Sequence, residues 1–128
     1  MDLVQVSRFE PMLTDEFKRR AFTPSEIDAR RGPDLAVRLA GCFAAKEAVL
    51  KALGTGWSDG VAWIEVEIVH APSGAPTVAL SGRAHEVAAE RGVARWLLSL
   101  SHDGDYATAT AIALGPAQAA SSASGSGE

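Results

Sequence analysis

After Arg38, the segment RLAGCFAAKEAVLKALGTG at residues 38–56 consists of small and apolar residues except for three charged ones, Lys46, Glu47 and Lys51. Glu47 and Lys51 are four residues apart, so on a helix their side chains are neighbours on one face. One interpretation is an ion pair worth about 0.3–0.5 kcal/mol on a solvated surface. The other is chemical, because a carboxylate can bind a hard cation and an ammonium can bind phosphate. The residue types alone leave both interpretations open.

A Gly-Thr-Gly turn directly follows these charged residues. Gly54 and Gly56 have no side chains, so we expect their backbone N–H groups to be accessible to an anion. A carboxylate, an ammonium and a glycine turn in this order are compatible with a site for nucleotide phosphates. The pattern favours that interpretation without deciding it.

The element that positions these charges is expected to be one long central helix, from about residue 34 to Leu53, ended by Gly54. At 100° per residue its apolar side chains would form a single stripe with Cys42 inside it. The members of this stripe are Leu39, Phe43, Val49, Leu50 and Leu53. The charged residues would then lie at the border of the stripe.

Two shorter helices are expected before the central one. Thr14 is the predicted N-cap of the first helix, which has acidic residues in its first turn and basic residues in its last. Thr23, Pro24 and Glu26 form the pattern of a capping box at the start of the second. Before both, the apolar residues within 2–9 indicate the end of a strand that enters a turn.

Strand patterns dominate the rest of the chain. Strands are predicted at 61–69 and 77–80, followed by a short helix at 81–92. Two further strands flank Asp103 and Gly104, a strong signal for a hairpin. Helices followed by a meander of strands with one inserted helix indicate an α+β fold with an antiparallel sheet.

The composition indicates one domain and a tail. A chain of 128 residues can bury a hydrophobic core without disulfides or metals, and we assign residues 1–115 to that domain. Residues 116–128 are mostly alanine, serine and glycine, which offer little to bury, so the tail is predicted to be disordered.

Charge, cysteine content and hydropathy exclude several classes of function. The net charge of −4 argues against nucleic acid as a partner. Cys42 is the only cysteine, which excludes an intramolecular disulfide. No apolar run is long enough to cross a membrane and no signal peptide is evident, so we expect a cytoplasmic protein without a membrane partner.

Several motifs together resemble one enzyme family. FAAKEAVLKALGTG is similar to the signature of the holo-[acyl-carrier-protein] synthases, the small phosphopantetheinyl transferases. DLVQVSRFE resembles the N-terminal segment of this family, GAPTVALSG its Gly-x-Pro strand, and WLLSLSHDGDYATATAIAL its C-terminal hairpin. The similarity extends from Asp2 to about Leu114. It implies the 4'-phosphopantetheinyl transferase fold and a homotrimer with active sites between neighbouring subunits.

The resemblance also implies a reaction and roles for the charged residues. The family transfers the 4'-phosphopantetheine group of coenzyme A to a serine of apo-acyl carrier protein in fatty-acid or polyketide biosynthesis. The reaction depends on Mg²⁺ and releases adenosine 3',5'-bisphosphate. Asp2 and Glu47 match the metal ligands of the family, and Lys51 matches its lysine near the phosphates. Lys46 is expected to contact coenzyme A in the same way.

Four further positions match the family less specifically. His102, in the Ser-His element, would contact a phosphate of coenzyme A or help to deprotonate the serine through water, or would simply be a turn residue. Gly54 and Gly56 would let the backbone approach the coenzyme. Pro76 would line the adenine site or set a strand edge.

A local basic patch is expected to recognise the carrier protein. Arg8, Lys18, Arg19 and Arg20 are close together in the sequence, although the chain as a whole is acidic. Without the resemblance, basic residues at a helix end are explained by the helix dipole. The resemblance implies instead that the acidic carrier protein docks there.

In one respect the sequence departs from the family pattern. Only Met1 precedes Asp2, whereas an apolar strand usually precedes the metal-binding aspartate, so we expect the native start to lie upstream and this form to bind Mg²⁺ poorly. Two alternatives remain open at this point. One is a catalytically weak or inactive carrier-protein-binding relative with an incomplete metal site, and the other is an unrelated structural α+β domain.

Overall fold

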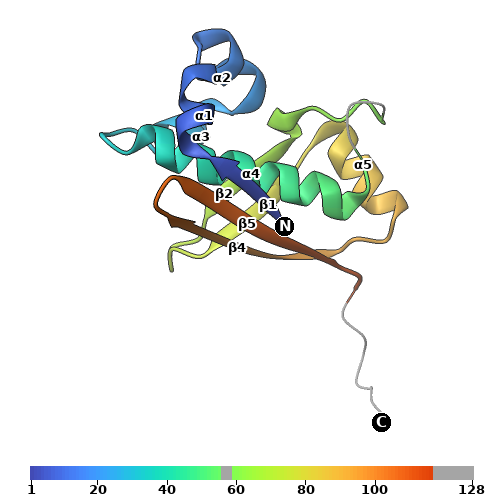
Figure 1. The fold of residues 1–128 in the computed structure, drawn as a ribbon. Coiled ribbons are helices and arrows are strands. Elements are labelled where there is room, and N and C mark those ends of the chain that lie inside the picture. Colours follow the sequence, from blue (N-terminus) through green and yellow to red (C-terminus); the bar gives the residue numbers. More distant parts are fainter. Residues whose placement is uncertain (56–58, 117–128) are drawn as a thin grey trace.

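The structure is a computed structural model that describes residues 1–55 and 59–116. Gly56 and the predicted tail from residue 117 onward therefore lie outside the described residues. A long helix, α4 (Leu35–Leu53), runs through the middle of the molecule, and a three-stranded antiparallel sheet packs along one side of it (Figure 1). The strands of this sheet, in spatial order, are β1 (Asp2–Gln5), β5 (Tyr106–Leu114) and β4 (Arg95–Asp103).

A second antiparallel sheet of two strands, β2 (Val66–His70) and β3 (Pro76–Leu80), also packs against α4. The predicted α+β class with antiparallel pairing is confirmed, but the pairing is divided between two sheets. The remaining elements are short: α1 (Val6–Phe9), η1 (Glu10–Met12), α2 (Asp15–Ala21), α3 (Pro24–Asp28), η3 (Trp63–Glu65) and α5 (Gly82–Glu90). None of the helices in the described part of the chain has the length and apolar character that a membrane crossing requires.

The predicted helix caps are confirmed. The Thr14 hydroxyl accepts a hydrogen bond from the backbone N–H of Phe17 at the start of α2. The Thr23 hydroxyl accepts one from the N–H of Glu26, and the Glu26 carboxylate accepts one from the N–H of Thr23, which completes the capping box. Gly54 ends α4 with φ +70°, a left-handed conformation that favours glycine.

The prediction of a single apolar stripe on the central helix is wrong. Helix α4 contacts both sheets and α1, and its buried residues lie on all sides of the helix. A helix enclosed in this way is a core helix, in which even a charged residue can be buried. The buried residues are Leu39, Ala40, Cys42, Ala44, Ala45, Lys46, Ala48, Val49, Leu50 and Leu53.

The C-terminal hairpin is confirmed, with its turn one residue later than predicted. Strands β4 and β5 pair from Arg95 with Leu114 to Asp103 with Tyr106, so Gly104 and Asp105 form the turn. Gly104 has φ +57°, which suits a two-residue hairpin loop.

The strand predicted at 61–69 begins only at Val66. Residues 63–65 form the short helix η3 instead, because the Glu65 carboxylate binds backbone N–H groups of two segments. It accepts hydrogen bonds from Ala62 of the same turn and from Arg83 and Ala84 at the start of α5. This turn directs Trp63 toward α2 and α4.

All four phenylalanines and Trp63 meet in one aromatic cluster. Phe9 comes from α1, Phe17 from α2 and Phe43 from α4, with Phe22 directly after α2. The paired ring centroids lie 5.3 to 6.3 Å apart, within the usual range for aromatic contacts. The cluster therefore joins the helices of the N-terminal half to the turn that carries Trp63.

Candidate active site

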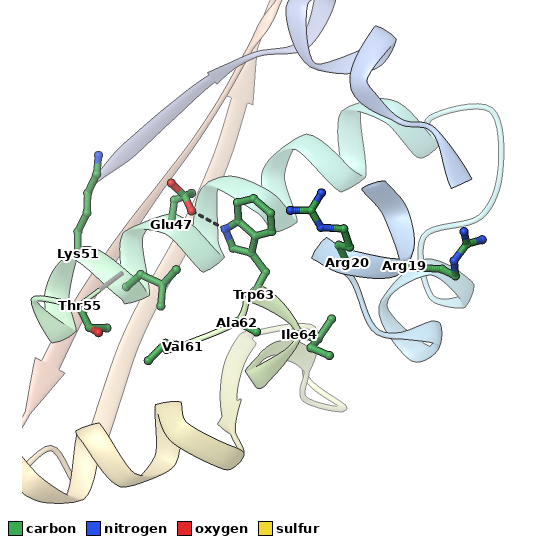
Figure 2. A pocket seen from close by; sticks show the side chains of 10 residues that line it. Arg19, Arg20, Glu47, Lys51, Thr55, Val61, Ala62, Trp63 and Ile64 are labelled. Carbon is green, nitrogen blue, oxygen red and sulfur yellow. Dashed lines mark hydrogen bonds between the residues drawn. The ribbon is translucent and has the colours of Figure 1, made fainter. Parts of the chain in front are cut away.

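A cavity of about 390 Å³ lies beside the C-terminal half of α4 (Figure 2). Glu47, Leu50 and Lys51 of α4 form one wall. The other walls are formed by Arg19 and Arg20 of α2 and by residues that follow α4, namely Thr55, Val61, Ala62, Trp63 and Ile64. An anionic ligand would therefore find three basic residues and one carboxylate around an apolar floor.

Lys51 forms an ion pair with Asp2. The Nζ of Lys51 lies 2.7 Å from Oδ1 of Asp2, and the two side chains are 61% and 15% exposed. The hydrogen bond and the charge of Asp2 raise the pKa of Lys51, and the charge of Glu47 adds to this effect. Among the described residues Lys51 is within ion-pair distance of Asp2 but not of Glu47, so the alternative of an ion pair between Lys51 and Glu47 is wrong.

Asp2 is held within the three-stranded sheet. It lies in β1 opposite Ala109 of β5, and its backbone oxygen accepts a hydrogen bond from the Thr108 hydroxyl at 2.8 Å. These contacts, together with Lys51, fix the first predicted metal ligand next to α4.

Glu47 is half-buried and is held by Trp63. The indole Nε1–H of Trp63 donates a hydrogen bond of 2.7 Å to Oε2 of Glu47, drawn as the dashed line in Figure 2. Sequence reasoning placed Trp63 in a strand and missed this contact. The two residues are 16 positions apart, so no local pattern identifies them as partners.

The carboxylates of Asp2 and Glu47 fit a Mg²⁺ ion only with oxygens from elsewhere. Mg²⁺ is commonly bound by one or two carboxylates, with water and substrate phosphates completing its coordination. Within the described residues, no group of three His, Cys, Asp or Glu side chains could hold a metal alone. The convergence of Asp2 and Glu47 on one cation stays a prediction.

Lys46 is a core residue, which contradicts its predicted contact with coenzyme A. Its side chain is fully buried, with Nζ 2.8 Å from Oε1 of Glu26. The same ammonium donates to the backbone oxygens of Trp63 at 3.0 Å and Val66 at 2.7 Å. Three donors and three protein acceptors leave no exposed N–H for a phosphate.

Glu26 is equally buried and binds a second set of groups. Its Oε2 accepts from the backbone N–H of Ile68 at 2.7 Å and lies 3.5 Å from Sγ of Cys42. Arg30, also buried, donates to the backbone oxygens of Glu26 and Ile68. Burial, with the charge of Glu26 adding, raises the pKa of Cys42 to about 12, so this thiol is un-ionised and packs as a small apolar group.

The backbone N–H of Gly54 is not free for an anion, contrary to our prediction for this residue. The N–H of Gly54 donates to the backbone oxygen of Lys51, and that of Thr55 to the oxygen of Leu50, so both complete the end of α4. Gly56 lies outside the described residues. Gly54 therefore ends the helix, and its predicted contact with coenzyme A has no support from the backbone geometry.

His102 lies in a different cavity from Glu47 and Lys51. This second cavity, of about 650 Å³, lies at the N-terminal half of α4, between that helix and the turn of the hairpin. It is lined by Ala29, Arg30, Asp34, Val37, Arg38, Gly41, His70, Leu100, Ser101, His102 and Gly104.

Burial and the charge of Arg30 lower the pKa of His70. Sequence reasoning did not identify His70 or Arg38 as site residues.

Pro76 begins β3 opposite His70 of β2. It does not line either cavity described above. The structure thus agrees with its alternative role as a residue that sets the edge of a strand.

The predicted basic patch divides into two parts. Arg19 and Arg20 line the first cavity, and Figure 2 shows Arg20 beside the Trp63 ring and Arg19 extending away from it. Arg8 and Lys18 do not line this cavity. Arg8 is exposed on α1, and Nζ of Lys18 lies 3.9 Å from Oδ1 of Asp15, one turn earlier on α2.

Residues 1–111 match the family model described as the 4'-phosphopantetheinyl transferase superfamily. The chain belongs to this superfamily. The resemblance found in the sequence motifs is thereby confirmed, and so is the enzyme class that it implies. The alternative of an unrelated structural domain is excluded.

Relatives within the superfamily agree in sequence and in structure. The chain is 51% identical over 122 residues to a holo-[acyl-carrier-protein] synthase of Desulforudis audaxviator, with 92% of each chain covered. The structure of the holo-[acyl-carrier-protein] synthase from Neisseria meningitidis matches with a TM-score of 0.80 and 30% identity, covering 88% of this chain and 94% of that one. The Helicobacter pylori enzyme, solved in complex with coenzyme A, matches with a TM-score of 0.77 and 29% identity, covering 88% and 96%.

Proposed function

We propose that the protein transfers the 4'-phosphopantetheine group of coenzyme A to a serine of apo-acyl carrier protein and releases adenosine 3',5'-bisphosphate. The observation that carries this proposal is that Lys51 is paired with Asp2 and also lies close enough to Glu47 to feel its charge, in a transferase whose relatives are holo-[acyl-carrier-protein] synthases. One of these relatives has been solved with coenzyme A.

Lys51 has the properties required to stabilise phosphate charge. Its pKa is raised and its side chain is mostly exposed, so a charged ammonium faces the cavity at neutral pH. As the serine oxygen attacks the β-phosphorus, the bond to the adenosine bisphosphate breaks and charge develops on the leaving phosphate. An ammonium fixed near that charge lowers the barrier.

Asp2 and Glu47 are the residues that would hold Mg²⁺. When bound, Mg²⁺ supplies charge neutralisation for the pyrophosphate of coenzyme A. Each carboxylate already has one protein donor, Lys51 for Asp2 and Trp63 for Glu47. These contacts orient the carboxylates before the metal arrives, which is the usual role of residues around a metal ligand.

The coenzyme site is proposed to be shared between neighbouring subunits of a homotrimer. Support comes from the separation of His102 and Lys51, which line different cavities of one chain. In that arrangement, His102 of a neighbouring subunit would bind a coenzyme phosphate or accept the serine proton through water.

Arg8, Lys18, Arg19 and Arg20 are proposed to dock the acidic carrier protein. Arg19 and Arg20 support this, because they line the same cavity as Glu47. A carrier protein held by these arginines would present its serine to the residues on α4. The fatty-acid or polyketide pathway and the cytoplasmic location stay predictions.

A catalytically weak or inactive carrier-protein-binding relative is the second candidate. The observation that favours it is the ion pair of Lys51 with Asp2, because the ammonium occupies an oxygen that a metal would need. The first candidate requires this pair to open or rearrange when coenzyme A and Mg²⁺ bind.

The deciding experiment is a mass measurement. Apo-acyl carrier protein is incubated with coenzyme A, Mg²⁺ and this protein, and intact masses are recorded over time. A gain of one phosphopantetheine per carrier protein supports transfer. An unchanged carrier mass, with binding still detectable, supports the second candidate, and a parallel incubation with EDTA tests the dependence on Mg²⁺.

A further inference from the structure

The indole N–H of Trp63 donates a hydrogen bond to the Glu47 carboxylate, with Nε1 and Oε2 2.7 Å apart. We propose that Trp63 is a positioning residue, which holds Glu47 in the orientation that binds the divalent cation. The proposal rests on the proposed function, because it assigns Glu47 to the metal site. It adds a residue outside the motif that carries Glu47 itself.

The Trp63 ring is fixed by its neighbours. It packs against Phe43 of α4, with ring centroids 5.3 Å apart, and against Phe17 of α2, at 5.8 Å. Its backbone oxygen accepts a hydrogen bond of 3.0 Å from the buried ammonium of Lys46. Side chain and backbone are therefore held by separate groups, and the indole N–H has little freedom to move away from Glu47.

Glu47 needs such a donor because its own side chain is flexible. A glutamate on a helix has several rotamers, and a half-buried one loses that freedom only if a contact selects one of them. A hydrogen bond to a charged carboxylate is roughly twice as strong as one between neutral groups. Removing a partner of this kind typically weakens metal binding or activity about 10–100-fold.

The same tryptophan joins Glu47 to the helix that carries the docking arginines. Phe17 lies on α2 two positions before Arg19, and both Arg19 and Trp63 line the cavity of Glu47. Lys46, adjacent to Glu47 in the sequence, holds the backbone of Trp63 from the core side. The buried Lys46 thus fixes the turn from which the Trp63 side chain reaches Glu47.

The test replaces Trp63 with phenylalanine, which keeps an aromatic ring for Phe17 and Phe43 but has no N–H. The matched control is Trp96→Phe, the same change at a half-buried tryptophan of β4 outside both cavities. Mn²⁺ serves as the probe, and its affinity is measured by electron paramagnetic resonance in the presence of coenzyme A. For Trp63→Phe we expect at least about tenfold weaker Mn²⁺ binding, and for Trp96→Phe an unchanged affinity.

A spectroscopic readout separates positioning from a general loss of structure. The indole N–H signal of Trp63 in a ¹⁵N–¹H spectrum, assigned by its loss in Trp63→Phe, should move when Mg²⁺ is added with coenzyme A. The indole signal of Trp96 should stay in place. In Glu47→Gln the Trp63 signal should shift without added metal and should no longer respond to Mg²⁺.

The outcomes distinguish this inference from the proposed function. Transfer by the wild-type chain together with equal Mn²⁺ affinity in Trp63→Phe would overturn the inference alone. Weaker Mn²⁺ binding by Trp63→Phe, with no transfer by the wild-type chain, would support the inference and overturn the proposed function. If the wild-type chain binds no Mn²⁺ even with coenzyme A present, both the inference and the proposed metal site are wrong.

Discussion

Lys46 and Lys51 are five residues apart on α4, and each has a carboxylate oxygen within 2.8 Å of its Nζ. The Lys46 side chain is fully buried with Glu26, whereas the Lys51 side chain is 61% exposed beside Asp2. The same two functional groups at the same distance therefore serve different purposes. The burial of the pair, rather than its chemistry, decides whether it belongs to the core or can take part in the proposed active site.

The physical difference between the pairs is the cost of removing charge from water. A buried pair is tolerated only if nearly all of its donors and acceptors have partners. Lys46 and Glu26 meet this condition, and no buried side-chain nitrogen or oxygen in the described part of the chain lacks a partner. An exposed pair contributes little to stability, so it can open for a ligand at small cost.

The largest effect is expected from Lys46→Met, because it leaves the Glu26 carboxylate buried without its counter-charge. The free energy of unfolding should fall by about 3–5 kcal/mol, measured by urea denaturation. The control is the double variant Lys46→Met, Glu26→Gln, which removes both charges and should recover part of the loss. A loss below about 1 kcal/mol in the single variant would contradict the structural role of this pair.

Lys51→Met should show the opposite pattern. We expect kcat/KM for phosphopantetheine transfer to fall about 10²–10³-fold, because a fixed positive group near the leaving phosphate is lost. The free energy of unfolding should change by less than about 1 kcal/mol, since the pair with Asp2 is exposed. Full activity in this variant would remove Lys51 from the site.

The buried region should also respond to alkaline pH through Cys42. Burial raises the pKa of this thiol from 9.0 to about 12, so above pH 9 the unfolded chain ionises its thiol while the folded chain does not. Stability from this group is therefore complete below pH 9 and decreases by about 1.4 kcal/mol per pH unit above it. Urea denaturation of Cys42→Ala across this window should give a shallower slope than the wild-type chain, and equal slopes would contradict the burial of the thiol.

The smallest effect is expected from Arg19→Glu. Arg19 lies outside both lysine pairs but lines the same cavity as Lys51. The KM of this variant for carrier protein should rise about tenfold, while its KM for coenzyme A stays constant, because a charge at the rim of an interface mainly affects docking. Added salt should reduce the difference. Arg31→Glu, at an exposed arginine paired with Asp28, is the matched control, and Arg8→Glu tests whether the patch extends to α1.

Features of the fold that depend on neighbouring residues were predictable from the sequence. Thr14 and Thr23 cap their helices as expected, and Gly54 ends α4. Each of these caps involves hydrogen bonds between residues three or four positions apart, so the local sequence is enough to predict it. The start of β2 was predicted too early because Glu65 binds the distant N–H groups of α5, and no local pattern reports that contact.

The candidate site was predictable only as far as the family motif extends. The family motifs predicted a metal site at Asp2 and Glu47 and a phosphate contact at Lys51, but they also assigned Lys46 to coenzyme A. The partner of Lys46 is Glu26, 20 residues earlier, and their contact exists only after α3 and β2 pack against α4. Trp63 was missed for the same reason, because its hydrogen bond to Glu47 depends on the turn at η3.

The place of β1 in its sheet has a consequence for how the protein matures on the ribosome. Among the described strands, β1 pairs only with β5, and Asp2 lies opposite Ala109. During synthesis β1 can pack against α4 early, but its backbone gains a pairing strand only when β5 has been made, and contacts of such large sequence separation form slowly. The hydrogen bond from Thr108 to Asp2 and the strand pairing that fix Asp2 beside Lys51 form only then, so a nascent chain that stops short of β5 would have all the motif residues of α4 but no sheet to hold Asp2 in place.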